Sequence, residues 1–247
     1  GIRWFPNGGS IAYYSNPISP DFGMREINTV NIEDGAQSRL TDTDGMIYVT
    51  YSMNSDGTKI AYSLLSFTES TVDIHVMNAD GDNDVNTINS ISTHETRPAW
   101  SPDDEKIAYN HEDAGGNYSI YTMNADGTNQ TKLTEITSSI AKPLWSPDGS
   151  KIAWHETSGG IGDIWVIDVN GTNKRKLTSN GDSMDYISWS PDSSKILFNH
   201  KTGITQTQIC VVNVEDSVIS QLTSSAAEKD RPSWSPDGNH ILFAARK

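Results

Sequence analysis

The sequence predicts an all-β fold, a six-bladed β-propeller in which each complete blade has four antiparallel strands. Two observations predict it: a hairpin of the Trp-Ser-Pro-Asp-Gly type, with variations, occurs six times, and a second hairpin fills each interval. Successive copies are separated by 49, 47, 45, 44 and 45 residues, which is the spacing of propeller blades. We therefore expect one domain over residues 1–247. The copies begin at Trp4, Met53, Trp100, Trp145, Trp189 and Trp234.

The first hairpin supplies strands A and B of each blade. It is clearest in "AWSPDDEKIAYNHE" at 99–112 and "LWSPDGSKIAWHE" at 144–156. The tryptophan is a large apolar side chain that can fill the space between blades, the proline can end strand A, and Asp-Gly turns the chain. Strand B is marked by an isoleucine seven residues after the tryptophan position. These isoleucines are Ile11, Ile60, Ile107, Ile152, Ile196 and Ile241.

The second hairpin supplies strands C and D, as in "SIYTMNADGTNQTKLT" at 119–134. Its centre is usually Asp-Gly or Asn-Gly, the strongest short signals for a tight hairpin turn. A strand covered on both faces by neighbouring blades explains continuous apolar runs such as "DIWVIDV" at 163–169. The alternative, a β-sandwich, is disfavoured by so many copies in register. Residues 53–57 and 85–90 depart from the repeat, so blade two should be the least regular.

These two repeated sequence motifs resemble those of the TolB-like, WD-repeat-related β-propeller family of the WSPDG type. The resemblance rests on the motif "WSPDG.KIA" followed by an aromatic residue, and then on a strand, Asp-Gly-Thr-Asn and Leu-Thr. It covers essentially the whole chain. The resemblance implies the propeller fold, a secreted or periplasmic location, and a channel mouth that receives partner peptides. It is weak for function, because one fold carries many activities.

The charge balance disfavours two classes of partner. Lysine and arginine number 18 against 32 acidic residues, a formal net charge of −14. Such a surface repels phosphate backbones and anionic lipids, so we expect no nucleic-acid binding and no membrane insertion. The single cysteine, Cys210, lies in an apolar run and is expected to be a small buried side chain.

Recognisable catalytic motifs are absent from the sequence, so we expect a non-catalytic protein without a cofactor. There is no Gly-x-Ser-x-Gly elbow, no His-Glu-x-x-His and no phosphate-binding glycine loop. His111, His155 and His200 follow strand B in three blades, but their offsets place them on different faces, against a shared metal. The acidic turn at 78–84 leaves calcium open as an alternative, although it lacks the glycine and glutamate of an EF-type loop.

Binding residues are expected where the connections vary among copies. The A–B and C–D turns are short and uniform, whereas the B–C connections differ greatly, and variable loops on a rigid scaffold usually carry binding. The D–A connections emerge on the same face and lead to the channel mouth. They provide the candidate partner-binding residues His94, Glu95, Arg97, Ser139, Lys142, Asp185, Tyr186, Lys229, Asp230 and Arg231.

Three functions remain open on the sequence. The first is a secreted or periplasmic module that binds a protein or peptide at the loop-rich face. The second is a structural subunit of an extracellular homo-oligomeric assembly. The third is a propeller that gates a peptidase-type enzyme domain.

The last copy contains strands A and B only, and this predicts an open edge. "HILFAARK" at 240–247 is strand B of blade six, and its exposed backbone groups and apolar side chains invite pairing with another chain. Arg246 and Lys247 could instead blunt the edge. Self-association through this strand is the resulting hypothesis.

Overall fold

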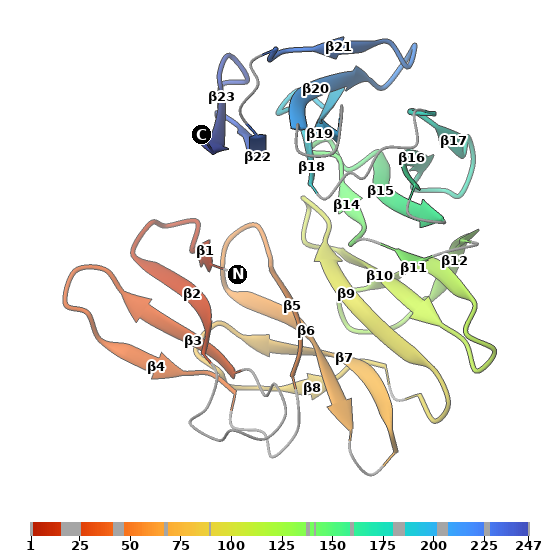
Figure 1. Ribbon diagram of the computed structural model, residues 1–247. Coiled ribbons are helices and arrows are strands. Elements are labelled where there is room, and N and C mark those ends of the chain that lie inside the picture. The colour runs from red at the N-terminus through yellow and green to blue at the C-terminus, as the bar shows by residue number, and fades with distance from the viewer. Residues whose placement is uncertain are drawn as a thin grey trace. The chain divides into compact units, whose positions relative to one another are not determined.

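The computed structural model describes most of the chain, and all regular structure in the described part is β-strand (Figure 1). None of the described residues forms a helix that is long and apolar enough to span a membrane. The chain divides into two compact units, Gly1–Lys132 and Leu133–Lys247. The described ranges are 2–15, 26–41, 47–66, 69–88, 90–136, 139–140, 142–158, 161–179, 186–201, 207–224 and 228–246.

The first unit contains three successive groups of antiparallel strands. Blade one has the order β1-β2-β3-β4, and blades two and three join into one sheet because β7 and β9 touch in parallel at Val72 and His94. The last strand, β12, crosses the boundary between the units. The strands are β1 (Ile2–Trp4), β2 (Ser10–Ser15), β3 (Glu26–Asn31) and β4 (Gln37–Arg39); β5 (Ile47–Met53), β6 (Lys59–Ser66), β7 (Thr71–Asn78) and β8 (Val85–Asn86); β9 (His94–Trp100), β10 (Lys106–Glu112), β11 (Tyr118–Asn124) and β12 (Thr131–Ile136).

The second unit continues the pattern with three more groups. Strand A of blade four is divided into two pieces that both pair with β15, and blade six consists of β22 and β23 in the described part of the chain. The predicted fold class is confirmed, including the incomplete sixth blade. The strands are β13 (Ser139–Ile140), β14 (Leu144–Trp145), β15 (Lys151–Ser158), β16 (Ile161–Asp168) and β17 (Arg175–Lys176); β18 (Ile187–Trp189), β19 (Lys195–Lys201), β20 (Thr207–Asn213) and β21 (Ile219–Gln221); β22 (Glu228–Trp234) and β23 (Ile241–Arg246).

The repeated Ser-Pro-Asp word forms a turn that is closed by side chains. In blade five the Ser190 hydroxyl donates to Asp192 at 2.6 Å and accepts the Lys195 backbone N–H at 2.9 Å. Asp192 in turn accepts the backbone N–H of Ser194. The serine therefore satisfies the first backbone donor of strand B, which explains why Ser and Asp recur at this spacing.

Blade two uses the same turn with a different residue. The Asn54 amide donates to Asp56 at 2.8 Å, and the Asn54 side-chain oxygen accepts the Lys59 backbone N–H at 2.8 Å. Asparagine thus replaces serine without changing the closure. The expectation that blade two is the least regular is wrong for this turn, because an amide can perform both of the roles that a hydroxyl performs.

The Leu-Thr ending of strand D has a parallel role. Its threonine hydroxyl accepts a backbone N–H from the isoleucine of strand C, so it extends the pairing of a short outer strand by one hydrogen bond. The leucine before it is buried in blades one and four. The bonds are Ile27 to Thr41 at 3.0 Å, Ile164 to Thr178 at 3.0 Å and Ile209 to Thr223 at 2.9 Å.

Within each unit, successive blades pack face to face through apolar side chains. Ala12, Ile27 and Leu40 of blade one meet Tyr51 and Ile60 of blade two in one buried cluster. Burial raises the pKa of Tyr51 to about 12, and its hydroxyl donates to the backbone oxygen of Ala12 at 2.8 Å.

The second unit has an equivalent cluster that contains Cys210. This cluster joins strands of blades four and five, and Cys210 is buried as expected. Burial raises the pKa of the Cys210 thiol to about 11, so the side chain behaves as a packed apolar group and not as a nucleophile.

Candidate functional site

Two arginines occupy the same strained position on strand A in different units. Arg97 of β9 and Arg231 of β22 have φ angles of 59° and 51°, in the left-handed region that non-glycine residues seldom adopt. Each stands directly before a proline, and at each the register with strand B shifts by a bulge. Strand A of blade two shifts register at the same place without a proline, between Tyr48 and Tyr51, so the bulge belongs to the strand and tolerates a proline that cannot donate to the sheet.

Arg97 interacts electrostatically with a tyrosine of blade three. Burial lowers the pKa of the Arg97 guanidinium, and the neighbouring Tyr118 opposes that shift. Tyr118 is paired with Glu112 across the β10–β11 hairpin. Burial, followed by the hydrogen bond to Glu112, raises the pKa of Tyr118. Arginine, tyrosine and carboxylate are therefore grouped at this end of the blade.

Arg231 also has a tyrosine partner, this time within the second unit. Its guanidinium carbon lies 5.9 Å from the centre of the Tyr186 ring, in a cation–π contact. Both side chains are exposed, Tyr186 with 42% of its surface accessible. The structure thus brings together two of the residues predicted from the sequence.

Two other predicted residues are buried and have structural roles. Glu95 is 1% exposed and accepts hydrogen bonds from Thr93 and Ser90, while His111 Nδ1 lies 3.0 Å from it. Lys229 is 3% exposed, and its backbone is tied to the hydroxyl of Thr207. Their side chains are withdrawn from solvent, so we leave both out of the proposed contact surface.

His94 connects blade three to blade two. Its Nδ1 accepts the backbone N–H of Val72 at 3.2 Å, beside the single parallel pairing between β9 and β7. Because Nδ1 is an acceptor there, the neutral ring carries its proton on Nε2. The half-buried ring therefore positions the start of β9.

The remaining predicted residues are only partly described. Lys142 is half-buried between β13 and β14, and Ser139 lies in β13. Asp230 lies in β22, one residue before the bulge. Asp185 lies outside the described residues.

Sequence reasoning missed Tyr118, Glu112 and a buried polar cluster next to them. The Ser90 hydroxyl lies 2.9 Å from Asp73 and 2.8 Å from Glu95, so one hydroxyl connects two carboxylates that are almost completely buried. The spacing of the hairpin could have indicated Tyr118, because it stands opposite Glu112. Ser90 could not have been found from the sequence, because residues 85–90 depart from the Leu-Thr ending of the other copies.

The structure shows how the possible metal ligands are used. No cluster of three or more His, Cys, Asp or Glu side chains suited to a metal occurs among the described residues. In the acidic turn at 78–84, Asp84 accepts a hydrogen bond of 2.5 Å from the Tyr62 hydroxyl and lies 3.2 Å from His75 Nδ1. These contacts occupy both of its carboxylate oxygens.

The TolB beta propeller domain family model matches residues 25–247. The chain belongs to the TolB β-propeller family. No curated protein matches it. Because the match spans nearly all of the described blades, the resemblance inferred from the repeated words is confirmed.

Solved structures show the same TolB-type propeller fold at low identity. TolB from Acinetobacter baumannii is 20% identical with a TM-score of 0.71, and the match covers 97% of this chain and 59% of that one. The chain therefore spans less than two thirds of that TolB. An oligogalacturonate lyase in complex with manganese is 18% identical, with a TM-score of 0.76 and coverage of 98% and 72%. A puromycin-hydrolyzing peptidase of Mycobacterium tuberculosis is 13% identical, with a TM-score of 0.75 and coverage of 96% and 42%.

Proposed function

We propose that this chain is a non-catalytic, periplasmic or extracellular propeller that binds a protein or peptide at the loop ends of its A strands. The observation that supports this most is the repeated Arg-Pro bulge, with Arg97 next to Tyr118 and Arg231 next to Tyr186. The fold does not need a left-handed arginine, because other blades form strand A without one. Strained positions of this kind are concentrated where binding is performed.

The chemistry of these pairs fits a protein partner. Arginine and tyrosine are enriched at the energetic centres of protein interfaces, where they supply charge-assisted hydrogen bonds and large contact areas. On a chain with a net charge of −14, each of these arginines would favour a partner segment that bears carboxylates. Family membership supports a binding role, while the partner and the compartment are part of the proposal.

The test compares partner capture by matched charge variants. An Arg97→Ala/Arg231→Ala double variant should lose the partner recovered by the wild-type chain from a periplasmic or secreted extract. A Lys106→Ala/Lys195→Ala double variant removes the same charge at the start of strand B and should retain it. Equal recovery by both variants, with unchanged circular dichroism, would overturn the proposal.

A second candidate, self-association through blade six, has its own observation. Leu242 is 77% exposed and Phe243 is 37% exposed on β23, and β22 is its only partner among the described strands. Nearby Leu222 is 47% exposed, whereas Leu40 and Leu177 at the same repeat position are 8% and 3% exposed. An apolar strand edge of this kind favours pairing with a second copy.

Light scattering over a dilution series tests this second candidate. The average mass should rise with concentration, and Leu242→Lys should abolish the rise. Ile91→Lys, which alters a residue that is 84% exposed elsewhere, is the control and should leave the rise unchanged. A wild-type mass that stays monomeric at every concentration would exclude self-association.

A further inference from the structure

A pocket of about 560 Å³ lies between blades one and two, at the end of the blades that carries the short turns. It is formed within the first unit, between the A–B turn of blade one and the two short turns of blade two. Its volume lies in the range of small-molecule sites, roughly 300 to 1,000 Å³. Within the first unit, the Arg97 bulge lies near the start of β9, whereas the A–B turns follow the ends of the A strands, so the pocket is separate from the Arg97 surface.

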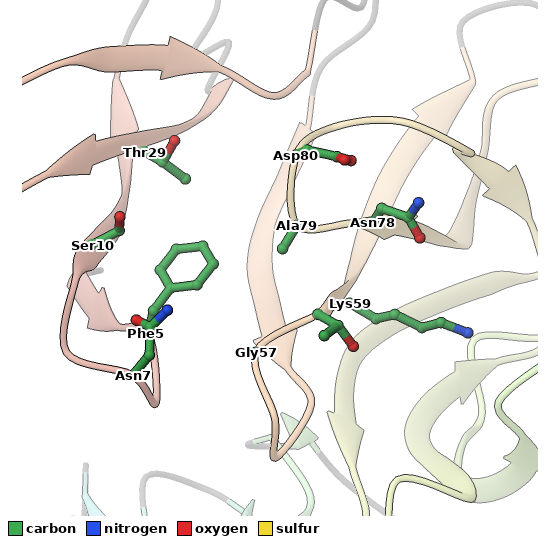
Figure 2. A pocket seen from close by; sticks show the side chains of 10 residues that line it. Phe5, Asn7, Ser10, Thr29, Gly57, Lys59, Asn78, Ala79 and Asp80 are labelled. Carbon is green, nitrogen blue, oxygen red and sulfur yellow. The ribbon is translucent and has the colours of Figure 1, made fainter.

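Figure 2 shows how the pocket is lined. The Phe5 ring reaches into the space between the blades toward Ala79, with Ser10 and Thr29 on its own side. The Lys59 side chain extends away from the ring. One wall is therefore apolar and aromatic, and the adjoining wall carries two hydroxyls. Asp80 adds a carboxylate at the rim.

Two of the lining residues, Phe5 and Ser10, are departures from the repeat. Phe5 stands where other blades have serine or asparagine, and Ser10 stands where four blades have lysine. Thr29 is shared with blade three, which has Thr122, whereas the other three complete blades have Val76, Val166 and Val211 at this position. The other blades fold with the common residues at these two positions, so the repeat itself does not require Phe5 or Ser10; Phe5 also packs against the buried cluster of blades one and two. The convergence of Phe5 and Ser10 on one pocket indicates a local function.

Ser10 is shorter than the lysine of other blades, and the pocket beside it is larger than its counterpart: the corresponding gap between blades five and six, which keeps Lys195, has a volume of about 300 Å³. At the same position in other blades, Lys106 Nζ reaches the Asn124 side chain at 3.2 Å and Lys151 forms an ion pair with Asp168. A lysine there lies across the end of strand C. Ser10 is too short to do so, and it shares its face with Ala12, which packs against blade two.

The polar groups of the pocket are available to a ligand. The hydroxyls of Ser10 and Thr29 make no hydrogen bond with any described residue. Asn7 uses its side-chain oxygen to accept the Gly9 backbone N–H at 2.9 Å, and its amide hydrogens remain available. Buried donors and acceptors need partners, so a ligand that excludes water here must supply hydroxyl-type groups.

We propose that this pocket binds one neutral hexopyranose residue. The apolar C–H face of the sugar would lie on the Phe5 ring, and its hydroxyls would bond to Ser10, Thr29 and Asn7. Anionic sugars are disfavoured because Asp80 lines the rim and the only lysine at the pocket points away. The net charge of −14 acts in the same direction.

Saturation-transfer NMR with glucose, galactose and mannose tests the proposal on the wild-type chain, with galacturonate as the anionic comparison. At least one neutral hexose should receive saturation at tens of millimolar and should shift the amide signals of Gly57 and Asn78. No transfer to any neutral hexose, or transfer to galacturonate alone, would overturn the proposal.

Variants that restore the repeat provide the second arm. Ser10→Lys, Thr29→Val and Phe5→Ser each introduce a residue that other blades carry, so the fold should be retained. Ser10→Lys and Phe5→Ser should lower hexose affinity at least tenfold, and Thr29→Val should lower it severalfold. Thr122→Val, the same change in blade three, is the matched control and should leave affinity unchanged. Wild-type affinity in folded Ser10→Lys would refute the site.

Discussion

Asp192 shows how a single residue of the repeat links the turn to solution pH. The hydrogen bond from Ser190, followed by those from Ser194, lowers the pKa of Asp192 to about 2. Ser101 and Ser235 have the same lowering effect on the pKa of Asp103 and Asp237. Because the folded pKa lies below the unfolded value of about 3.9, the contribution to stability is complete above that value and is lost as the pH falls toward 2.

Replacing Ser190 tests this link. Ser190→Ala should raise the pKa of the Asp192 carboxyl toward about 3.9. It should also cost roughly 1 kcal/mol at neutral pH, because the Lys195 N–H loses its acceptor. The readouts are a carboxyl NMR titration and urea unfolding. Ser233→Ala, whose exposed hydroxyl makes one weak contact of 3.4 Å, should change neither quantity. An unshifted Asp192 pKa in Ser190→Ala would contradict the assigned cause.

The C–D turns show how one element is fitted to the next. In blades two and three, the glycine of this turn approaches the end of strand D of the preceding blade. A Cβ on Gly127 would lie 2.2 Å from the backbone oxygen of Thr87, and one on Gly81 would lie 3.0 Å from that of Leu40. Both glycines also have a positive φ, so they satisfy a turn and a close approach at the same time.

Two glycine variants separate these roles. Gly116→Ala, at φ 76° with nothing within 4 Å, should cost about 1 kcal/mol from backbone strain alone. Gly127→Ala, at φ 85°, should cost roughly 1–3 kcal/mol more because the methyl group overlaps Thr87. The difference between the midpoints of urea unfolding measures the packing contribution. Equal losses would show that the close approach carries no energy.

The whole molecule carries a net charge of −14, and this charge opposes compactness. Raising the ionic strength from about 0.01 M to about 0.15 M shortens the screening length from roughly 30 Å to 8 Å. We expect Tm to rise by a few degrees over this range at constant pH. Differential scanning fluorimetry in NaCl and in KCl measures it. A Tm that is independent of both salts would mean that favourable ion pairs, such as Lys176 with Asp163, balance the repulsion.

For the whole molecule, the sequence predicted the structural features that recur in every copy of the repeat. The period, the turns and the two-strand sixth blade were predictable, because each copy specifies the same hairpins independently. The site was less accessible. The loop end of strand A was located, yet Glu95 and Lys229 are buried, since alternation along a strand fails at a bulge that shifts the register. The pairing of Arg97 with Tyr118 joins different strands and carries no mark in the local sequence.

The contacts between blades have a direction along the chain. Gly81 and Gly127 are seated on the strands of the blade before them, and the indoles of Trp189 and Trp234 donate to backbone oxygens of the preceding strand A at 3.1 Å and 3.3 Å. During synthesis, each blade therefore leaves the ribosome after the blade against which it packs. Folding can proceed vectorially, with every new blade templated by an older one, so that an unfinished chain exposes a single growing face.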